Sequence, residues 1–460
     1  MQIFRKGFIW KRVIETGSGF INFLTRFLRK TWRNEKVTDA IIRWLPYIIG
    51  SILTASVAVL YSKLFDEASS ISHHVKANFP WLFFIITPAA FLLSWWIVWK
   101  FSKAAGGSGI PQLMAAINPK RENEKVSTGF LLGGKTLVTK IVSSFVALLG
   151  GAVIGREGPT IQISGSVFYI THKFFPKVRD RVDRDTMLIA GGAAGLAAAF
   201  NTPLGGIVFA IEELSRSHLN VFKSSLLYAV IFSGMTVQWL LGPYLFLGYP
   251  RADAGGFSLL GYTLIFSAIA GFAGGLNGRL IYWLTEFTKR IKRVFVYVLY
   301  VGLSGLALAF IIYVNENSAF GPGKDVMNAI LFNGKEGHIS IFLFFSRFFG
   351  MIISYATGIA GGIFAPTLSS GSILGQLLMN LFHLDPGNKV LILVAMIGML
   401  TGITRAPFTS AILVLEMTDR HSAIFLFILA GLVSAVTARL ADPKPLYSRL
   451  EENYLRPSGP

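Results

Sequence analysis

The chain of 460 residues contains no cysteine, few charged residues and only seven histidines. Without cysteine it has no disulfide framework and no thiolate to ligate a metal or act as a nucleophile. No two histidines stand four residues apart, as a helical HxxxH zinc motif requires, so we expect no metal site. Charged residues make up 15% of the chain, against about 25% in soluble domains. This deficit excludes an ordinary soluble protein.

Apolar residues make up 53% of the sequence, and the mean hydropathy is +0.56. A spanning helix needs about 20 apolar residues, and several runs are too short, too long or too rich in glycine and proline for one plain helix. We therefore predict an all-α polytopic membrane protein with tilted and broken helices. Broken backbone at membrane depth is tolerated only inside protein or along a water-filled cavity, which favours a transport pathway. The runs are Leu45–Leu64, Pro80–Phe101, Phe130–Gly150, Met187–Ile211, Leu226–Leu247, Phe257–Phe287, Val294–Val314, Ile341–Ile359, Val390–Ile403 and Ala406–Leu440.

The formal net charge of +19 comes from basic clusters that lie between the apolar runs rather than along one face. This distribution argues against a nucleic-acid partner. Because short cytoplasmic loops are enriched in lysine and arginine, we place both termini and the basic loops 118–125, 172–185 and 289–293 in the cytoplasm. Residues 1–36 are typical of a basic amphipathic helix on the membrane surface. A partly disordered basic tail is the alternative.

The sequence repeats itself weakly. Pro203 is followed nine residues later by Glu212, and Pro407 is followed nine residues later by Glu416, an offset of 204. "GREGPT" (155–160) similarly aligns with "GIFAPT" (362–367), an offset of 207. We therefore divide the membrane part into two repeats, 37–249 and 250–440, followed by a C-terminal segment, 441–460. Repeats interrupted by glycine and proline at corresponding positions mark a transporter's central site.

Three segments combine glycines with a proline at or near a helix start: "GGSGIPQ" (106–112), "GREGPT" and "GGIFAPT" (361–367). Proline suits the first helical turn, and a helix N-terminus offers unpaired N–H groups and a partial positive charge to an anion. Burying a bare anion costs on the order of 20 kcal/mol. Converging helix N-termini offset much of this cost and still let the ion leave. The sequence thus predicts an anion site.

Four segments resemble the signature segments of the CLC family of chloride channels and chloride/proton antiporters. They are "GSGIP" (107–111), "GREGP" (155–159), "GIFAP" (362–366) and "KPLYS" (444–448), in the family's order. The resemblance implies a CLC-type fold of two inverted-topology repeats, in a homodimer with one pore per subunit. The chain stops soon after Tyr447, without CBS domains, so we expect a bacterial-type protein of the inner or plasma membrane.

The resemblance also implies the chloride ligands. Ser108 and Tyr447 would offer their hydroxyl groups, while Ile363 and Phe364 would offer backbone N–H groups. Read from the residues alone, the alternative for Ser108 is an N-cap, and the alternative for Tyr447 is an anchor at the membrane interface. By the resemblance, serine at position 108 favours chloride over nitrate or fluoride.

By the same resemblance, Glu157 is the gating glutamate. Ionised, its carboxylate imitates the anion and fills the site; protonated, it moves aside. Acidic residues inside a membrane are costly and mark function. Gly107 and Gly158 let the backbone approach the anion, and Arg156 and Lys140 keep the field positive. The alternative for Lys140 is a lysine that snorkels to the interface. For Glu157 the alternative is an acid favoured only by the helix dipole.

Glu213 decides between channel and exchanger, because antiporter members carry an internal proton-accepting glutamate at this place. Glu212 beside it either aids proton access or pairs with a nearby base, and Glu416 stabilises the repeat structure. We therefore predict a secondary-active chloride/proton antiporter that binds chloride and a proton and needs no cofactor. A passive voltage- or pH-gated chloride channel is the alternative, and a fluoride exporter comes third.

An enzyme using Glu157 and Glu213 as an acid pair finds no support. The sequence offers no nucleophile constellation, no metal-ligand cluster and no phosphate loop.

Overall fold

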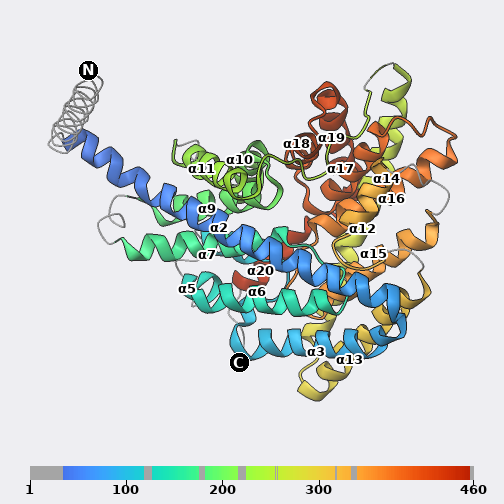
Figure 1. The fold of residues 1–460 in the computed structure, drawn as a ribbon, viewed down its shortest axis with the longest axis horizontal. Helices are drawn as coiled ribbons and strands as arrows, with labels where there is room; N and C mark the ends of the chain where they lie inside the picture. Colours follow the sequence, from blue (N-terminus) through green and yellow to red (C-terminus); the bar gives the residue numbers. More distant parts are fainter. Residues whose placement is uncertain are drawn as a thin grey trace, which may run out of the picture.

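The computed structural model describes residues 35–455 except 119–126, 176–181, 216–223, 254, 256, 316–318 and 333–338. The surface helix expected at residues 1–36 therefore falls, up to residue 34, outside the described part. Within that part every regular element is a helix, and β-pairing is limited to two isolated bridges. Figure 1 shows helices of very different lengths and directions, as expected for tilted and broken membrane helices.

Nine α-helices precede residue 250. They are α2 (Glu35–Asn78), α3 (Phe83–Phe101), α4 (Ile110–Ile117), α5 (Thr128–Leu132), α6 (Gly134–Leu149), α7 (Glu157–Phe174), α9 (Arg184–Phe200), α10 (Pro203–Phe209) and α11 (Ser224–Leu241), counted among the described residues. Short 3₁₀ turns η1 (Pro80–Leu82) and η2 (Lys103–Ala105) flank α3, and a π-helical turn η4 (Ala210–Leu214) continues α10.

The described residues after 250 form the second half of the bundle. Its helices are α12 (Phe257–Lys289), α13 (Val294–Val314), α14 (Lys324–Phe332), α15 (Ile341–Ala356), α16 (Phe364–Leu381), α17 (Val390–Thr404), α18 (Pro407–Thr418), α19 (Ile424–Ala441) and α20 (Leu446–Leu455), with the 3₁₀ turn η7 (His421–Ala423) before α19.

The helices divide by length into spanning and partial ones. Seven helical stretches of the described chain are long and apolar enough to cross a membrane. In contrast, α4 has 8 residues, α10 has 7 and α18 has 12, too few to span about 30 Å of hydrocarbon. The prediction of a multi-pass bundle with broken helices is confirmed.

The breaks recur at corresponding places in the two halves. Helix α9 ends at Asn201 with φ 56°, and α17 ends at Arg405 with φ 63°. Two residues later Pro203 and Pro407 open α10 and α18. A left-handed residue terminates a helix, and proline fits the start of the next. The offset of 204 residues thus reflects a repeated turn.

Reciprocal contacts link the two halves. The Glu212 carboxylate accepts a hydrogen bond from the amide of Thr409 in the first turn of α18, at 2.7 Å. The Glu416 carboxylate accepts one from the amide of Gly205 in the first turn of α10, also at 2.7 Å. An exchange in which each element contacts the other's counterpart is the signature of a twofold relation. Glu416 links the two halves, as expected of a residue that stabilises the repeat structure. Glu212 was expected to aid proton access or to pair with a base, but it binds the N-terminus of α18.

The C-terminal helix returns to the first half of the chain. Helix α20 packs against α4, and Figure 1 shows α20 among the helices of the first half. In the second half α12 packs against α17 and α19, and α16 packs against α17. This return brings the "KPLYS" segment to the loop that contains Ser108.

Candidate anion site

The three glycine-rich segments meet through backbone hydrogen bonds. The amide of Gly107 donates to the carbonyl of Ile359 at 2.9 Å, and the amide of Gly361 donates to the carbonyl of Gly107 at 3.0 Å. Gly155 and Gly362 exchange two hydrogen bonds, each of 2.8 Å. These bonds hold the N-termini of α4, α7 and α16 next to one another. The convergence predicted from the sequence is confirmed.

Gly158 allows α7 and α4 to approach closely. A Cβ atom at this position would collide with Ser108 Oγ and would lie 3.0 Å from the Ser108 carbonyl oxygen. It would also lie 3.3 Å from the Cα atom of Gly362. Only glycine fits between these two segments, so Gly158 shapes the site by having no side chain.

The hydroxyl groups of Ser108 and Tyr447 are buried, and among the residues that the structure describes neither has a hydrogen-bond partner. The two side chains lie close enough to interact, but neither hydroxyl has a well-aligned hydrogen-bond partner among the described residues. The N-cap of α4 is Gly109, with φ 104°, and no side chain caps this helix, so the N-cap interpretation of Ser108 is wrong. Tyr447 is fully buried, so the interface-anchor interpretation is wrong too. Since buried polar groups are normally bonded, two unpartnered hydroxyls indicate room for a ligand.

Ile363 and Phe364 lie at the N-terminus of α16, as N-cap and first helical residue. The first amides of a helix have no partner within it. Neither amide has an acceptor among the described residues. The Phe364 ring stacks against Tyr447, with ring centroids 6.3 Å apart and an interplanar angle of 14°. This stacking brings the tyrosine to the same helix end as the two free amides.

Glu157 is the first residue of α7, and 1% of its surface is exposed. Its Oε2 accepts a hydrogen bond of 3.4 Å from the amide of Ala365, in the first turn of α16. The carboxylate thus reaches from one helix N-terminus to another. It occupies the kind of position in which an anion would be stabilised.

Arg156, next to Glu157, has a partner that the sequence did not reveal. Its Nη1 lies 2.7 Å from Asp66 Oδ1 of α2 and 3.2 Å from the carbonyl oxygen of Ser62. The side chain of Asp66 is 65% exposed. The buried guanidinium group therefore pairs with a carboxylate that stays exposed. In the sequence Asp66 is only an acidic residue just after an apolar run, and this pattern does not predict which basic residue it contacts.

Lys140 is fully buried. Its Nζ donates to the carbonyl oxygen of Gly107 at 2.8 Å and lies 3.5 Å from that of Gly106. The snorkelling interpretation is therefore wrong. The Lys140 side chain instead holds the backbone of the loop that carries Ser108.

Glu213 lies in η4, with 2% of its surface exposed. Tyr447 interacts electrostatically with both Glu213 and Glu157. The tyrosine is therefore near enough to both predicted proton carriers to sense their charges. The adjacent Glu212 faces α18 instead, so the two neighbouring glutamates have different surroundings.

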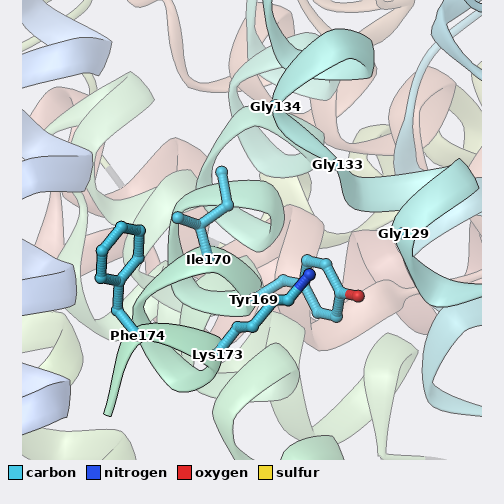
Figure 2. Close-up of a pocket in the computed structure, with 7 residues that line it drawn as sticks. All are labelled: Gly129, Gly133, Gly134, Tyr169, Ile170, Lys173 and Phe174. Atoms are coloured by element: carbon cyan, nitrogen blue, oxygen red, sulfur yellow. The ribbon is translucent and has the colours of Figure 1, made fainter.

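A separate pocket of about 570 Å³ opens between the α5–α6 turn and the C-terminal part of α7. Figure 2 shows Tyr169, Ile170, Lys173 and Phe174 near the glycine backbone of α5 and α6. These residues belong to the end of α7 opposite Glu157. The pocket is therefore distinct from the site at the helix N-termini.

Comparison with known proteins gives matches along most of the chain. Residues 89–439 match the family described as voltage gated chloride channel. The H(+)/Cl(-) exchange transporter ClcA of Klebsiella pneumoniae is 28% identical over 427 residues, covering 90% of this chain and 88% of that one. A slow cyanobacterial Cl-/H+ antiporter of known structure is similar with a TM-score of 0.78 and 25% identity, covering 90% and 98% of the two chains. A CLC-type fluoride/proton antiporter shares the fold, with a TM-score of 0.73 and 18% identity over 88% and 96% of the two chains.

Proposed function

Because this chain belongs to the family of voltage gated chloride channels, we propose that it exchanges chloride for protons across the membrane. The Glu157 carboxylate at the N-terminus of α16 is the observation that carries this proposal. A carboxylate held by a helix amide is the protein's own substitute for a bound anion. Chloride and the ionised glutamate therefore compete for the same donors, which couples the movement of one ion to the protonation of the other.

Chloride binds between the unpartnered hydroxyls of Ser108 and Tyr447 and the amides of Ile363 and Phe364. All four groups donate hydrogen bonds, and none carries a full charge. Dipoles of this kind offset the desolvation of the ion without holding it as a fixed ammonium group would. Gly107 and Gly158 allow the backbone to come close to the ion. The positive charges of Arg156 and Lys140 support the field from outside the first layer of ligands.

The proton passes through Glu213 and Glu157. A proton from the cytoplasm reaches Glu213 first and continues to Glu157, which releases it on the other side after moving away from α16. Support comes from the burial of both carboxylates and from their common neighbour Tyr447. Two relatives that exchange H⁺ and Cl⁻ support the coupling of proton movement to chloride movement.

The test is the reversal potential of purified protein in liposomes under crossed chloride and proton gradients. An exchanger gives a reversal potential that depends on both gradients. A potential insensitive to pH would refute exchange and identify a passive channel. Competition by fluoride at concentrations far below those of chloride would identify a fluoride exporter.

Glu213→Gln removes the internal proton carrier with little change in shape. We expect chloride flux to continue while proton uptake against its gradient stops. Glu212→Gln is the matched control, because it alters the adjacent carboxylate, which binds the N-terminus of α18. Uphill proton transport that persists in Glu213→Gln would contradict the assignment of this residue.

The protein functions as a homodimer in the bacterial inner or plasma membrane, with both termini in the cytoplasm and one pore in each subunit. The partial helices α10 and α18 support the dimer, since they are too short to span the bilayer yet expose Leu204, at 52%, and Phe408, at 47%. Irregular backbone ends at membrane depth require a protein cover. Single-molecule photobleaching in liposomes should show two steps per particle, and one step would refute the dimer.

A further inference from the structure

Tyr355, in α15, contacts the loop that carries Ser108. It is the penultimate residue of α15, and 6% of its surface is exposed. Its hydroxyl oxygen accepts a hydrogen bond from the backbone amide of Ser108 at 3.4 Å. The phenol thus binds the amide of the very residue whose own hydroxyl group is left without a partner.

The proton of the Tyr355 hydroxyl is uncommitted. A phenol can accept and donate at the same time, and among the described residues this hydroxyl accepts from Ser108 and donates to none. The neighbouring Gly107 has φ 66°, and a Cβ atom at this position would lie 3.1 Å from the phenol oxygen. Because glycine has no side chain, the phenol oxygen stays uncovered on this side. The hydroxyl therefore keeps a donor available at the edge of the loop.

This donor lies close to the two unpartnered hydroxyls. Tyr447 lies close enough to interact with both Tyr355 and Ser108. Three hydroxyl groups, from α15, from α20 and from the loop before α4, therefore gather in one buried region. Within the described part of the chain, the Ser108 and Tyr447 hydroxyls have no well-aligned hydrogen-bond partner, and the Tyr355 hydroxyl accepts a hydrogen bond but donates none.

We propose that Tyr355 is a third anion-binding hydroxyl group, which passes the positive end of the Ser108 amide dipole on to the bound ion. An O–H group that accepts a hydrogen bond becomes a stronger donor, because hydrogen bonds in a chain polarise one another. In this chain of hydrogen bonds the Ser108 N–H donates to the phenol oxygen and the phenol O–H donates to the anion, so the loop before α4 reaches the ion through one side chain. This inference rests on the proposed chloride site and adds a ligand to it.

The competing explanation is that Tyr355 only satisfies the Ser108 amide. The two explanations predict opposite effects when the hydroxyl is removed. If the phenol donates to the ion, its loss weakens chloride binding. If it merely occupies the amide, its loss frees an N–H group for the ion, and chloride binding becomes stronger or stays the same.

The experiment is calorimetric titration of chloride into the purified full-length protein, for the wild type and Tyr355→Phe. Phenylalanine keeps the ring and deletes only the oxygen. We expect chloride to bind about tenfold more weakly or worse, as for the loss of one hydrogen bond to a charged group. An unchanged or higher affinity would overturn the proposal. Should the variant be unstable in gel filtration, Tyr355→Met fills similar apolar volume and carries the same expectation.

Tyr47→Phe is the matched control. Tyr47 is a buried tyrosine, 3% exposed, in a separate hydrophobic cluster with Phe168 and Met187, and its variant should bind chloride like the wild type. Tyr447→Phe provides the reference for a lost hydroxyl ligand. If the wild type itself does not bind chloride, the proposed function fails. If the wild type binds but Tyr355→Phe is unaffected, only the role of Tyr355 fails.

Discussion

Replacing Glu157 by glutamine should separate the two halves of the exchange cycle. The glutamine carbonyl can still accept from Ala365, but it lacks the charge that the N-terminus of α16 stabilises. A negative charge at a helix N-terminus is stabilised by about 1–2 kcal/mol in a partly buried geometry. The internal competitor loses that amount, so the apparent affinity for chloride should rise about 5- to 30-fold. Chloride flux should continue, and uphill proton movement should cease.

Two measurements check this prediction, namely calorimetric chloride titration and proton uptake into liposomes driven by a chloride gradient. Glu416→Gln is the matched control, since its carboxylate also accepts from a helix N-terminus, at 2.7 Å from the amide of Gly205. The control should lower stability by about 1 kcal/mol, as for a lost helix cap, and leave coupling intact. Uphill proton transport by Glu157→Gln, or an unchanged chloride affinity, would refute the competition mechanism.

Three further predictions concern the structure around the site. Gly158→Ala would press a methyl group against Ser108. Thermal unfolding should therefore show a free energy of unfolding lower by about 1–3 kcal/mol, and calorimetry should show a loss of chloride binding. Wild-type values in both measurements would contradict the packing argument. Asp66→Asn removes the carboxylate that pairs with the Arg156 guanidinium, although 65% of the Asp66 side chain is exposed. Denaturation should therefore show a free energy of unfolding lower by no more than about 1 kcal/mol, and the difference should shrink with added salt. A hydrogen bond with His73 lowers the pKa of Asp325 below its ordinary value of 3.8. The ionised carboxylate therefore contributes to stability above that pH, and this contribution is lost as the pH falls through the lowered pKa. Between pH 3 and 6 the melting temperature of Asp325→Asn should depend less on pH than that of the wild type, and an equal pH dependence would disprove the contribution.

The sequence alone predicted the membrane class, the broken helices and the three helix starts that form the site. These features are local, because an apolar run sets a spanning helix and a proline after glycines sets a helix N-terminus. The boundaries of α13, Val294–Val314, coincide with the predicted run. The run at 187–211 divides into α9 and α10 just before Pro203. The repeat offset of 204 residues was also readable, because both copies kept the proline and the glutamate.

Other features were decided only by the tertiary structure. Asp66 pairs with Arg156 across 90 residues, Glu212 binds α18 across nearly 200, and Tyr355 reaches Ser108 across 247. The two partners of each pair belong to different elements of the fold, and a sequence pattern reports only neighbours within one element. The sequence therefore determined which residues offer donors, charges and helix ends. Packing decided which of them meet, because a hydrogen bond or an ion pair forms only when its two groups come within a few ångströms of each other.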